Sequence, residues 1–349
     1  MLLPRAKENP RPHNADGGAG SFTPMIMNGP SDPELHVVTG GAGFIGSHLV
    51  DAILAQGHRV RVVDDFSTGH RRNLPDGVEL LCGSINDLAD GAVQGAQVVY
   101  HLAAQVSVPR SVEDPLGSHH STAASSLAVL SAAERAGVRR VVLASSSAVY
   151  GDRPAQPKKE NHEPAPASPY AVAKLCSEIY ARHWADHRGL QTVSLRFFNV
   201  FGPRQDPRSP YAAAIPIFLS NLMADRPVPI FGDGKQTRDF TYVEDVVQGI
   251  LSAGSALGAS GHVYNIAAGR GTSVLEMVET LAQLVGVRAQ LEMLPPRAGD
   301  ITHSRADISA ATRDLKYAPR TGLKQGLVRT VDWFREAATS KTPGSRSGK

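Results

Sequence analysis

A glycine-rich segment between a strand and a helix sets the strongest constraint on how this chain can fold. Gly40-Gly-Ala-Gly-Phe-Ile-Gly46 follows the apolar run at 36–39, and a helical pattern of apolar residues extends from Phe44 to Gln56. Glycine allows a tight turn and a close approach of the backbone to a ligand, and the first N–H groups of the helix face an anion. With a second strand at Arg59–Val63, the segment predicts a βαβ unit that binds a dinucleotide pyrophosphate.

A carboxylate at the end of the second strand indicates which dinucleotide this is. Asp64 follows the glycine loop at the distance typical of the residue that accepts hydrogen bonds from the adenosine ribose. Its negative charge would repel a 2′-phosphate, so the pattern favours NAD over NADP. Asp65 is the weaker candidate, and we expect it to cap the loop that follows.

Strand and helix patterns continue to alternate as far as residue 200. Further strands are expected at 79–81, 97–102, 140–144 and 192–197, and helices at 116–136 and 170–187. Alternation of this kind predicts an α/β fold, a Rossmann doubly wound parallel sheet with helices on both faces.

The organisation of the chain changes after Gly202, where prolines become frequent. We predict an NAD-binding Rossmann domain over residues 34–202. A smaller C-terminal α/β lobe for the substrate is expected mainly over 203–335, with the possibility of a strand returned to the main sheet. Residues 1–33 and 336–349 show no periodicity and are expected to be a disordered leader and tail.

Composition excludes several classes of function. The net charge is only +3 with no dense basic stripe, so we expect no nucleic-acid partner. Cys82 and Cys176 have no metal-ligand spacing, which predicts no metal site and suits a reducing cytoplasm. No apolar run approaches the ~20 residues that cross a bilayer, and we expect no membrane association.

A tyrosine and a lysine four positions apart suggest the chemistry. Tyr170 and Lys174 share one face of the predicted helix at 170–187. A phenol with a pKa of ~10 is a poor base, but a neighbouring ammonium and a positive nicotinamide ring would lower that pKa. The serines 145–147 follow the strand at 140–144, at the sheet edge where ligands gather, and one of them can hydrogen-bond the reacting oxygen.

These motifs resemble those of the extended short-chain dehydrogenases/reductases, in the nucleotide-sugar epimerase group closest to UDP-glucose and UDP-N-acetylglucosamine 4-epimerases. The resemblance covers about residues 35–335. It is carried by the glycine loop together with segments 63–69, 101–104, 145–151, 168–174, 195–204, 230–234, 238–242 and 297–301.

The resemblance implies roles for individual residues. Tyr170 would be the base, Lys174 its tuner and a ligand of the nicotinamide ribose, and Ser147 the helper at the sugar 4-oxygen. The NAD contacts would come from Gly40, Gly43, Phe44, Ile45, Gly46, Asp64, Ser67, Thr68, Gly69, Ser84, Ile85, Leu102, Ala103, Ala104, Tyr170 and Lys174.

Substrate contacts follow from the same resemblance. Asn199, Arg238 and Arg297 would hold the nucleotide diphosphate, since guanidinium forks match phosphate oxygens. Asp300 would contact the nucleoside ribose, or alternatively pair with Arg297. The substrate-binding set implied is Arg110, Ser147, Asn199, Arg238, Arg297, Asp300 and Ser304.

Two positions depart from the pattern of the family. Ser84 stands where relatives usually have an aspartate that contacts the adenine amine, so the hydrogen-bond acceptor at this position is uncharged here. Thr122 stands where a buried asparagine is usual, which bears on how the catalytic helix is supported.

The favoured reaction is 4-epimerisation of a UDP-hexose through a 4-keto sugar. A nucleotide-sugar dehydratase or decarboxylase is an alternative, but such relatives carry an acidic residue beside the catalytic hydroxyl, and here Ala148 follows Ser147. A non-enzymatic NAD sensor is more remote, because such proteins tend to lose the tyrosine or lysine that this chain keeps.

Substrate choice and assembly are further expectations. Ser304 falls at a pocket-gating position, and a small residue there leaves room for an N-acetyl group, so UDP-GlcNAc and UDP-GalNAc are predicted beside UDP-glucose and UDP-galactose. UDP-glucuronate is the close alternative, because Arg110 or Arg204 could bind its carboxylate. Relatives usually dimerise through the helices that correspond to 116–136 and 168–187, which predicts a homodimer.

Overall fold

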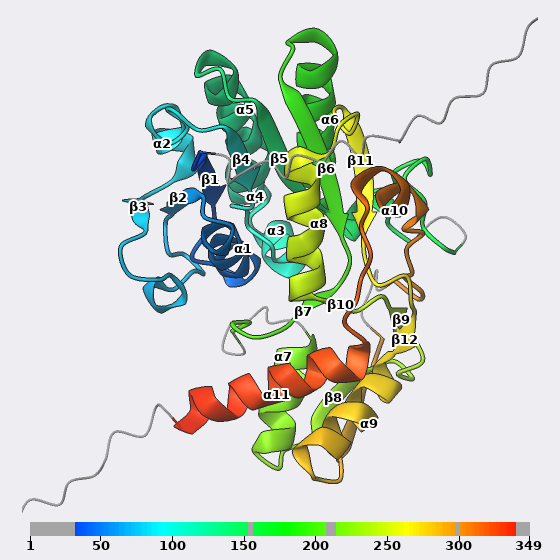
Figure 1. The fold of residues 1–349 in the computed structure, drawn as a ribbon. Helices are drawn as coiled ribbons and strands as arrows, with labels where there is room; N and C mark the ends of the chain where they lie inside the picture. The colour runs from blue at the N-terminus through cyan, green and yellow to red at the C-terminus, as the bar shows by residue number, and fades with distance from the viewer. Residues whose placement is uncertain (1–31, 153–155, 207–213, 297–300, 340–349) are drawn as a thin grey trace, which may run out of the picture. The chain divides into compact units, whose positions relative to one another are not determined.

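Seven parallel strands form the central sheet of this computed structural model, which describes residues 32–152, 156–206, 214–296 and 301–339 (Figure 1). The strand order is β11-β6-β5-β4-β1-β2-β3, and every neighbouring pair is parallel. This order confirms the predicted doubly wound sheet. The strands are β1 (Leu35–Thr39), β2 (Arg59–Asp64), β3 (Glu79–Cys82), β4 (Val98–His101), β5 (Arg140–Ser146), β6 (Gln191–Phe197) and β11 (His262–Ile266).

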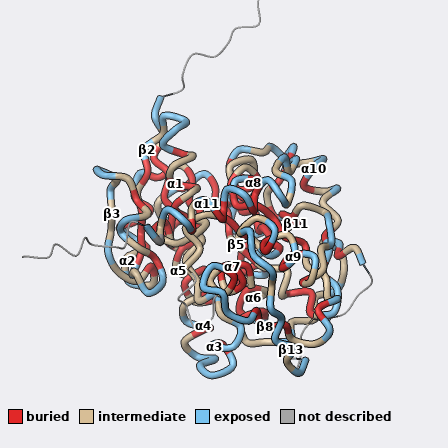
Figure 2. Tube along the Cα trace, turned by 90° about the horizontal axis from the view of Figure 1, so that it is seen from below, coloured by how far each residue is buried: buried red, intermediate tan, exposed pale blue. Residues whose placement is uncertain are grey.

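Helices cover both faces of this sheet. One face carries α1 (Phe44–Ala55), α8 (Val243–Ser255) and α10 (Ser309–Leu315), and the other carries α2 (Ile85–Ala92), α5 (Ser125–Arg135) and α6 (Pro169–His187). Because the sheet is covered on both sides, its inner strands are apolar almost throughout, and all five residues of β1 are buried. Figure 2 shows the buried residues along the strands and on the helix faces turned toward them.

The helix predicted at 116–136 is not one regular helix. It consists of α4 (Pro115–His119), a π turn at His120–Ala124 and α5. The carbonyl oxygen of Thr122 accepts the backbone N–H of Ser125. It also accepts hydrogen bonds from the hydroxyls of Ser125 at 3.0 Å and Ser126 at 2.8 Å. A serine-rich sequence thus stabilises an irregularity that apolar periodicity does not reveal.

A separate core holds the elements of the second half of the chain that do not join the sheet. Phe218, Ile230, Met277 and Leu327 belong to this core. Its elements are α7 (Ala214–Met223), β8 (Val228–Phe231), α9 (Val274–Val285), β13 (Leu291–Leu294) and α11 (Leu323–Thr339), which lie together below the sheet in Figure 1. The range 203–335 also contributes α8, α10 and β11 to the sheet. The domain boundary at residue 202 stays a prediction, as do the leader and tail, which lie largely outside the described residues.

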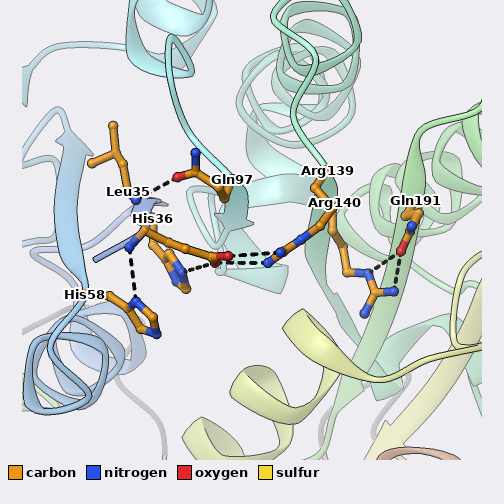
Figure 3. A network of polar contacts seen from close by, with 8 residues as sticks. Leu35, His36, His58, Gln97, Arg139, Arg140 and Gln191 are labelled. Atoms are coloured by element: carbon orange, nitrogen blue, oxygen red, sulfur yellow. Dashed lines mark hydrogen bonds and ion pairs between the residues drawn. The ribbon is translucent and has the colours of Figure 1, made fainter. Parts of the chain in front are cut away.

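A polar network ties together the strand ends opposite the glycine loop (Figure 3). The Glu34 carboxylate accepts hydrogen bonds from Arg139 at 3.0 Å and pairs with Nε2 of His36 at 3.2 Å. The rings of His36 and His58 stack with centroids 4.7 Å apart, and Nδ1 of His58 accepts the backbone N–H of Glu34. Burial lowers the pKa of His36 below its usual value, although Glu34 acts in the opposite direction.

This network predicts a loss of stability in acid. The pKa of His36 is depressed in the folded chain, so below the ordinary histidine value the unfolded state binds the extra proton more readily. We expect the free energy of unfolding of the wild type to fall relative to that of His36→Phe as the pH drops from 7.5 to 5, measured by urea denaturation. The same comparison with His119→Phe, an exposed position on α4, should show no such trend. Parallel pH curves for wild type and His36→Phe would contradict this origin.

Candidate active site

The strand order of the sheet reverses between β1 and β4, and doubly wound sheets bind their ligands in the crevice at this point. Loops that follow neighbouring parallel strands diverge at such a point and leave room for a ligand. The loop after β1 lies close to the segment after β4, since a Cβ added at Gly40 would stand 2.9 Å from the backbone nitrogen of Ala103. The backbone N–H of Ala103 is itself held by the hydroxyl of Thr39, at 3.1 Å. The predicted contacts Leu102–Ala104 therefore lie beside the glycine loop.

The glycines of the loop are required by its geometry. A Cβ at Gly46 would lie 2.1 Å from the carbonyl oxygen of Gly40, and Gly40 itself has a φ of +69°. Gly43 is the N-cap of α1, and the first turn of that helix contains no acidic residue. The loop therefore brings bare backbone and the N-terminus of a helix to the crevice, which suits a pyrophosphate. These residues fit NAD.

Asp64 is fixed at the end of β2 beside this loop. Its buried carboxylate accepts the backbone N–H groups of Ala42 at 2.9 Å and Phe66 at 2.8 Å. Burial raises the pKa of Asp64, while these two hydrogen bonds lower it. Gly69 packs directly on the carboxylate, because a Cβ there would be 2.8 Å from Oδ1. A carboxylate held in this way keeps lone pairs for ribose hydroxyls.

The neighbouring cofactor residues have structural partners of their own. The carboxylate of Asp65 accepts both the backbone N–H and the hydroxyl of Ser67, at 2.9 and 2.6 Å, which confirms the expected loop cap. Ser84 is the N-cap of α2 and accepts the N–H of Asn86 at 3.2 Å. Its contact with adenine stays a prediction, as do those of Ser67, Thr68 and Ile85.

Tyr170 and Lys174 meet near the carboxyl end of β5. The helix that carries them begins at Pro169, where the hydroxyl of Ser168 caps it by accepting the N–H of Ala171. Both side chains are buried, and the Lys174 ammonium lies 6.0 Å from the centre of the Tyr170 ring. The same ammonium donates a hydrogen bond of 2.6 Å to the carbonyl oxygen of Ala144. The predicted pair on one helix face is thus present and anchored to the sheet.

The pKa of Tyr170 differs from the expectation. Burial raises the pKa of Tyr170 above its ordinary value, and a side-chain hydrogen bond with Ser146 acts to lower it. Burial also lowers the pKa of Lys174 to about 8, against the opposing effect of Glu178. The expected lowering of the pKa of Tyr170 is therefore not a property of the chain alone, because burial outweighs its neighbours.

The structure singles out Ser146 among the three serines. β5 extends to Ser146, beyond the predicted end at Ala144, and Ser147 begins the short helix η3 (Ser147–Tyr150). The hydroxyl of Ser145 donates to Glu178, and that of Ser146 interacts with Tyr170. The hydroxyl of Ser146 also accepts the backbone N–H of Ala148 at 3.2 Å. The role predicted for Ser147 at the sugar 4-oxygen stays a prediction. Strand alternation would have indicated Ser146 if the end of β5 had been known.

A buried ion pair behind the tyrosine and lysine escaped the sequence reasoning. Arg196 of β6 donates to both carboxylate oxygens of Glu178 on α6, at 2.9 and 2.7 Å, and the two side chains are 3% and 6% exposed. Glu178 follows Lys174 by one helical turn, which was the available signal. The carboxylate thus links α6 to β6 and, through Ser145, to β5.

The hydroxyl cluster at the π turn bears on the substitution at Thr122. Thr122 is buried, and its hydroxyl has no hydrogen-bond partner among the described residues. The link to α6 is made by Ser126, whose hydroxyl lies 2.9 Å from that of Ser177 and can accept its proton while it donates to the carbonyl of Thr122. The contact between the π turn and α6 is therefore made by serines.

The predicted substrate residues are only partly described. Ser304 is buried, and its backbone N–H donates to the carbonyl oxygen of Thr237 at 3.1 Å, next to Arg238 in β9 (Thr237–Arg238). Asn199 lies between β6 and β7 (Val200–Phe201), and Arg110 is exposed on α3 (Val108–Glu113). Arg297 and Asp300 lie outside the described residues, so their roles stay predictions.

A doubly wound sheet with a glycine loop, a ribose-side carboxylate and a buried tyrosine–lysine pair defines a nicotinamide-dependent enzyme of the short-chain dehydrogenase/reductase type. Comparison with family models matches residues 36–267 to the NAD dependent epimerase/dehydratase family. The chain belongs to this family, and its cofactor is NAD.

Similar proteins include nucleotide-sugar epimerases, a UDP-glucuronic acid decarboxylase of Arabidopsis thaliana and a dTDP-glucose 4,6-dehydratase of Streptomyces venezuelae. A UDP-glucose 4-epimerase of Mycolicibacterium smegmatis is 40% identical over 311 residues, which are 86% of this chain and 98% of the relative. A Thermotoga maritima UDP-glucose 4-epimerase crystallised with UDP-glucose has a TM-score of 0.84 and 36% identity, covering 87% of this chain and 99% of its own. A Methanobrevibacter ruminantium UDP-N-acetylglucosamine 4-epimerase bound to UDP-N-acetylmuramic acid has the same TM-score, identity and coverage. Across the described residues, no helix is long and apolar enough to cross a membrane.

The buried ion pair predicts a large loss of stability when one partner is removed. Glu178→Gln leaves Arg196 as an uncompensated buried charge, so we expect the free energy of unfolding to fall by about 3–5 kcal/mol. The control is Asp186→Asn, which removes the exposed ion pair with Arg182 on the same helix and should cost about 1 kcal/mol or less. Urea denaturation measures both. Equal small losses would show that the buried pair contributes no more than the exposed one.

Proposed function

We propose that this protein is a UDP-hexose 4-epimerase that uses bound NAD and passes through a transient 4-keto sugar. The observation that carries the proposal is the buried pair of Tyr170 and Lys174 on α6, anchored to the end of β5 where Ser146 lies. A phenol and a serine hydroxyl at this position can share the proton of one sugar hydroxyl. We further propose that the nucleotide sugar binds mainly to the lobe at 203–335.

The roles of the side chains follow from their positions. When bound, NAD supplies the hydride acceptor for C4 of the sugar and the hydride that returns to it. Tyr170 takes the proton of the 4-hydroxyl, and Ser146 hydrogen-bonds the 4-oxygen while it loses that proton. Lys174, anchored on Ala144, places a positive charge beside the phenol and favours its phenolate form. Glu178 acts on Tyr170 only through Lys174. Its negative charge raises the pKa of Lys174 and so favours the ammonium form.

The segment after the catalytic serine favours epimerisation over dehydration or decarboxylation. Those reactions need a second proton transfer, for which an acidic residue beside the hydroxyl is typical. Whether Ser146 or Ser147 is the catalytic hydroxyl, the residues that follow are Ser147 and Ala148, and neither is acidic. A proton donor for a leaving group is therefore missing from this position.

The sugar pocket favours neutral and N-acetylated hexoses. Ser304 is a small residue, and at the gating position that the resemblance implies a small side chain takes less of the space that an N-acetyl group needs. Of the two arginines considered for a uronate, Arg204 is occupied by an ion pair with Asp51 at 2.7 Å. UDP-glucuronate is the second candidate substrate through Arg110 alone. The free thiols of Cys82 and Cys176 fit the proposed site of action in the cytoplasm.

Three substitutions test the catalytic assignment. Tyr170→Phe removes the base and should lower kcat by about 10²–10⁴-fold, and Ser146→Ala should lower it by about 10²-fold or more. Ser147→Ala is the matched control, since it deletes the same hydroxyl one position further along and should change kcat little. Sugar products are followed by NMR with UDP-glucose and UDP-galactose. A larger loss for Ser147→Ala than for Ser146→Ala would return the role to Ser147, and no turnover of any UDP-sugar would refute the epimerase.

Substitutions at the gating residue Ser304 test the choice of substrate. We expect the wild type to convert UDP-GlcNAc to UDP-GalNAc, and Ser304→Tyr to lose this activity while it keeps that on UDP-glucose, because a tyrosine fills the space of the N-acetyl group. The ratio of kcat/KM values for the two substrates measures the effect. Ser304→Ala, which keeps the position small, is the control. Full N-acetyl activity in Ser304→Tyr would contradict the gate, and preferred turnover of UDP-glucuronate would support the second candidate.

We also propose a homodimer through α3, α4 and α6, which pack together. Large apolar side chains are exposed on these helices, and a second copy of the chain would bury them. The residues are Val112 at 64% exposure, Leu116 at 82%, Val172 at 46% and Ile179 at 60%.

Charged substitutions test this surface. Leu116→Glu combined with Ile179→Glu should convert a dimer into a folded monomer, because two charges in each copy would be buried at the interface. Light scattering after size exclusion gives the mass, and circular dichroism verifies folding. Leu257→Glu, at a 95% exposed residue outside these helices, is the control and should stay dimeric. A monomeric wild type would rule out the proposed assembly.

A further inference from the structure

A cavity outside the candidate active site is lined by three arginines. It lies between the loop that follows β11, the residue after Ser304, and the segment that leads into α11. Its volume is about 650 Å³, within the range of small-molecule pockets. The described candidate residues for catalysis, cofactor and substrate are all absent from its lining. The arginines are Arg270, Arg305 and Arg320.

The side chains that line this cavity carry positive charge only. All three arginines are exposed, and none has an ion-pair partner within the described ranges of the chain. The described lining contains no aspartate or glutamate, whereas Thr272 and Thr321 add hydroxyl groups. Positive charges of one sign in a concave surface attract an anion. Guanidinium groups match phosphate oxygens in particular, because their N–H groups form a planar fork.

Two buried aspartates hold the loops of the cavity from behind. Asp239, which is 0% exposed, accepts the backbone N–H groups of Ala268 at 2.9 Å and Ala306 at 3.1 Å. Asp245 accepts those of Arg320 at 2.8 Å and Thr321 at 3.1 Å. The carboxylates thus fix the backbone of each loop while the arginine side chains remain available. A site that is already ordered loses less entropy when it binds a ligand.

We propose that this cavity binds a small phosphate-bearing anion at a site separate from that of the nucleotide sugar. The cavity is larger than one phosphate group needs, so the ligand class is a phosphorylated small molecule. The site adjoins the proposed substrate pocket along the chain, because Arg305 follows the gate residue Ser304 and Asp239 follows Arg238. An anion held there would fix the segment that carries the gate. This proposal does not depend on which reaction the enzyme catalyses.

Calorimetry with inorganic phosphate tests the site on the full chain at constant ionic strength. Saturating NAD and UDP are present, so that the two expected phosphate-binding regions are filled. We expect one phosphate to bind, and the affinity to fall at least tenfold in Arg305→Ala/Arg320→Ala. Arg288→Ala, an exposed arginine on the loop after α9 and outside the cavity, should bind phosphate as the wild type does. Sulfate should compete, and chloride at equal ionic strength should not.

Three results would overturn the proposal. Phosphate binding that disappears once UDP is saturating would place the anion in the nucleotide-sugar site. Unchanged affinity in the double variant, or an equal loss in Arg288→Ala, would show that the cavity arginines do not form the site. Asp245 contacts the backbone N–H of Arg320 and not its side chain, so the variants should fold. Thermal unfolding verifies this. Single Arg305→Gln and Arg320→Gln variants, each expected to weaken binding, replace the double variant if it unfolds.

Discussion

The hydrogen bond from the Lys174 ammonium to the carbonyl oxygen of Ala144 joins α6, which carries the proposed base, to the end of the central strand β5. Both groups are inside the protein, where a lysine left unpaired would be costly. The bond therefore fixes the register of α6 against β5, and with it the position of Tyr170 relative to Ser146. Glu178 and Arg196 extend this connection to β6. The chemistry of the site depends on these few polar contacts between a helix and two strands.

Buried carboxylates have a related role elsewhere in the chain. Asp64, Asp239 and Asp245 each accept backbone N–H groups from loops that precede helices or follow strands. Burial raises the pKa of Asp239 to about 6, while its hydrogen bonds lower it. Loops held by such bonds present a defined surface without strand pairing. The cofactor crevice and the arginine-lined cavity are both built in this way.

The proposed reaction follows from what is present and what is missing beside the phenol. Tyr170 and Ser146 can share one proton, and the two residues after Ser146 offer no second acid. Burial of Tyr170 keeps the phenol protonated in the protein alone, because desolvation disfavours its anion. Charge supplied when cofactor and substrate bind is then what makes the tyrosine a base. Proton transfer by Tyr170 would then require that cofactor and substrate are both bound.

The sequence by itself determined the sheet, the cofactor and the tyrosine–lysine pair. The spacing of the glycines, the aspartate at the strand end and the four-residue separation of Tyr170 and Lys174 are local patterns, which can be read directly from the sequence. Only the tertiary structure showed that Ser146 interacts with Tyr170, because that depends on where β5 ends. The same holds for the partnership of Glu178 with Arg196 and for the arginines at 270, 305 and 320, which come from segments far apart in the chain. Their convergence is a property of packing, which no periodicity along the sequence records.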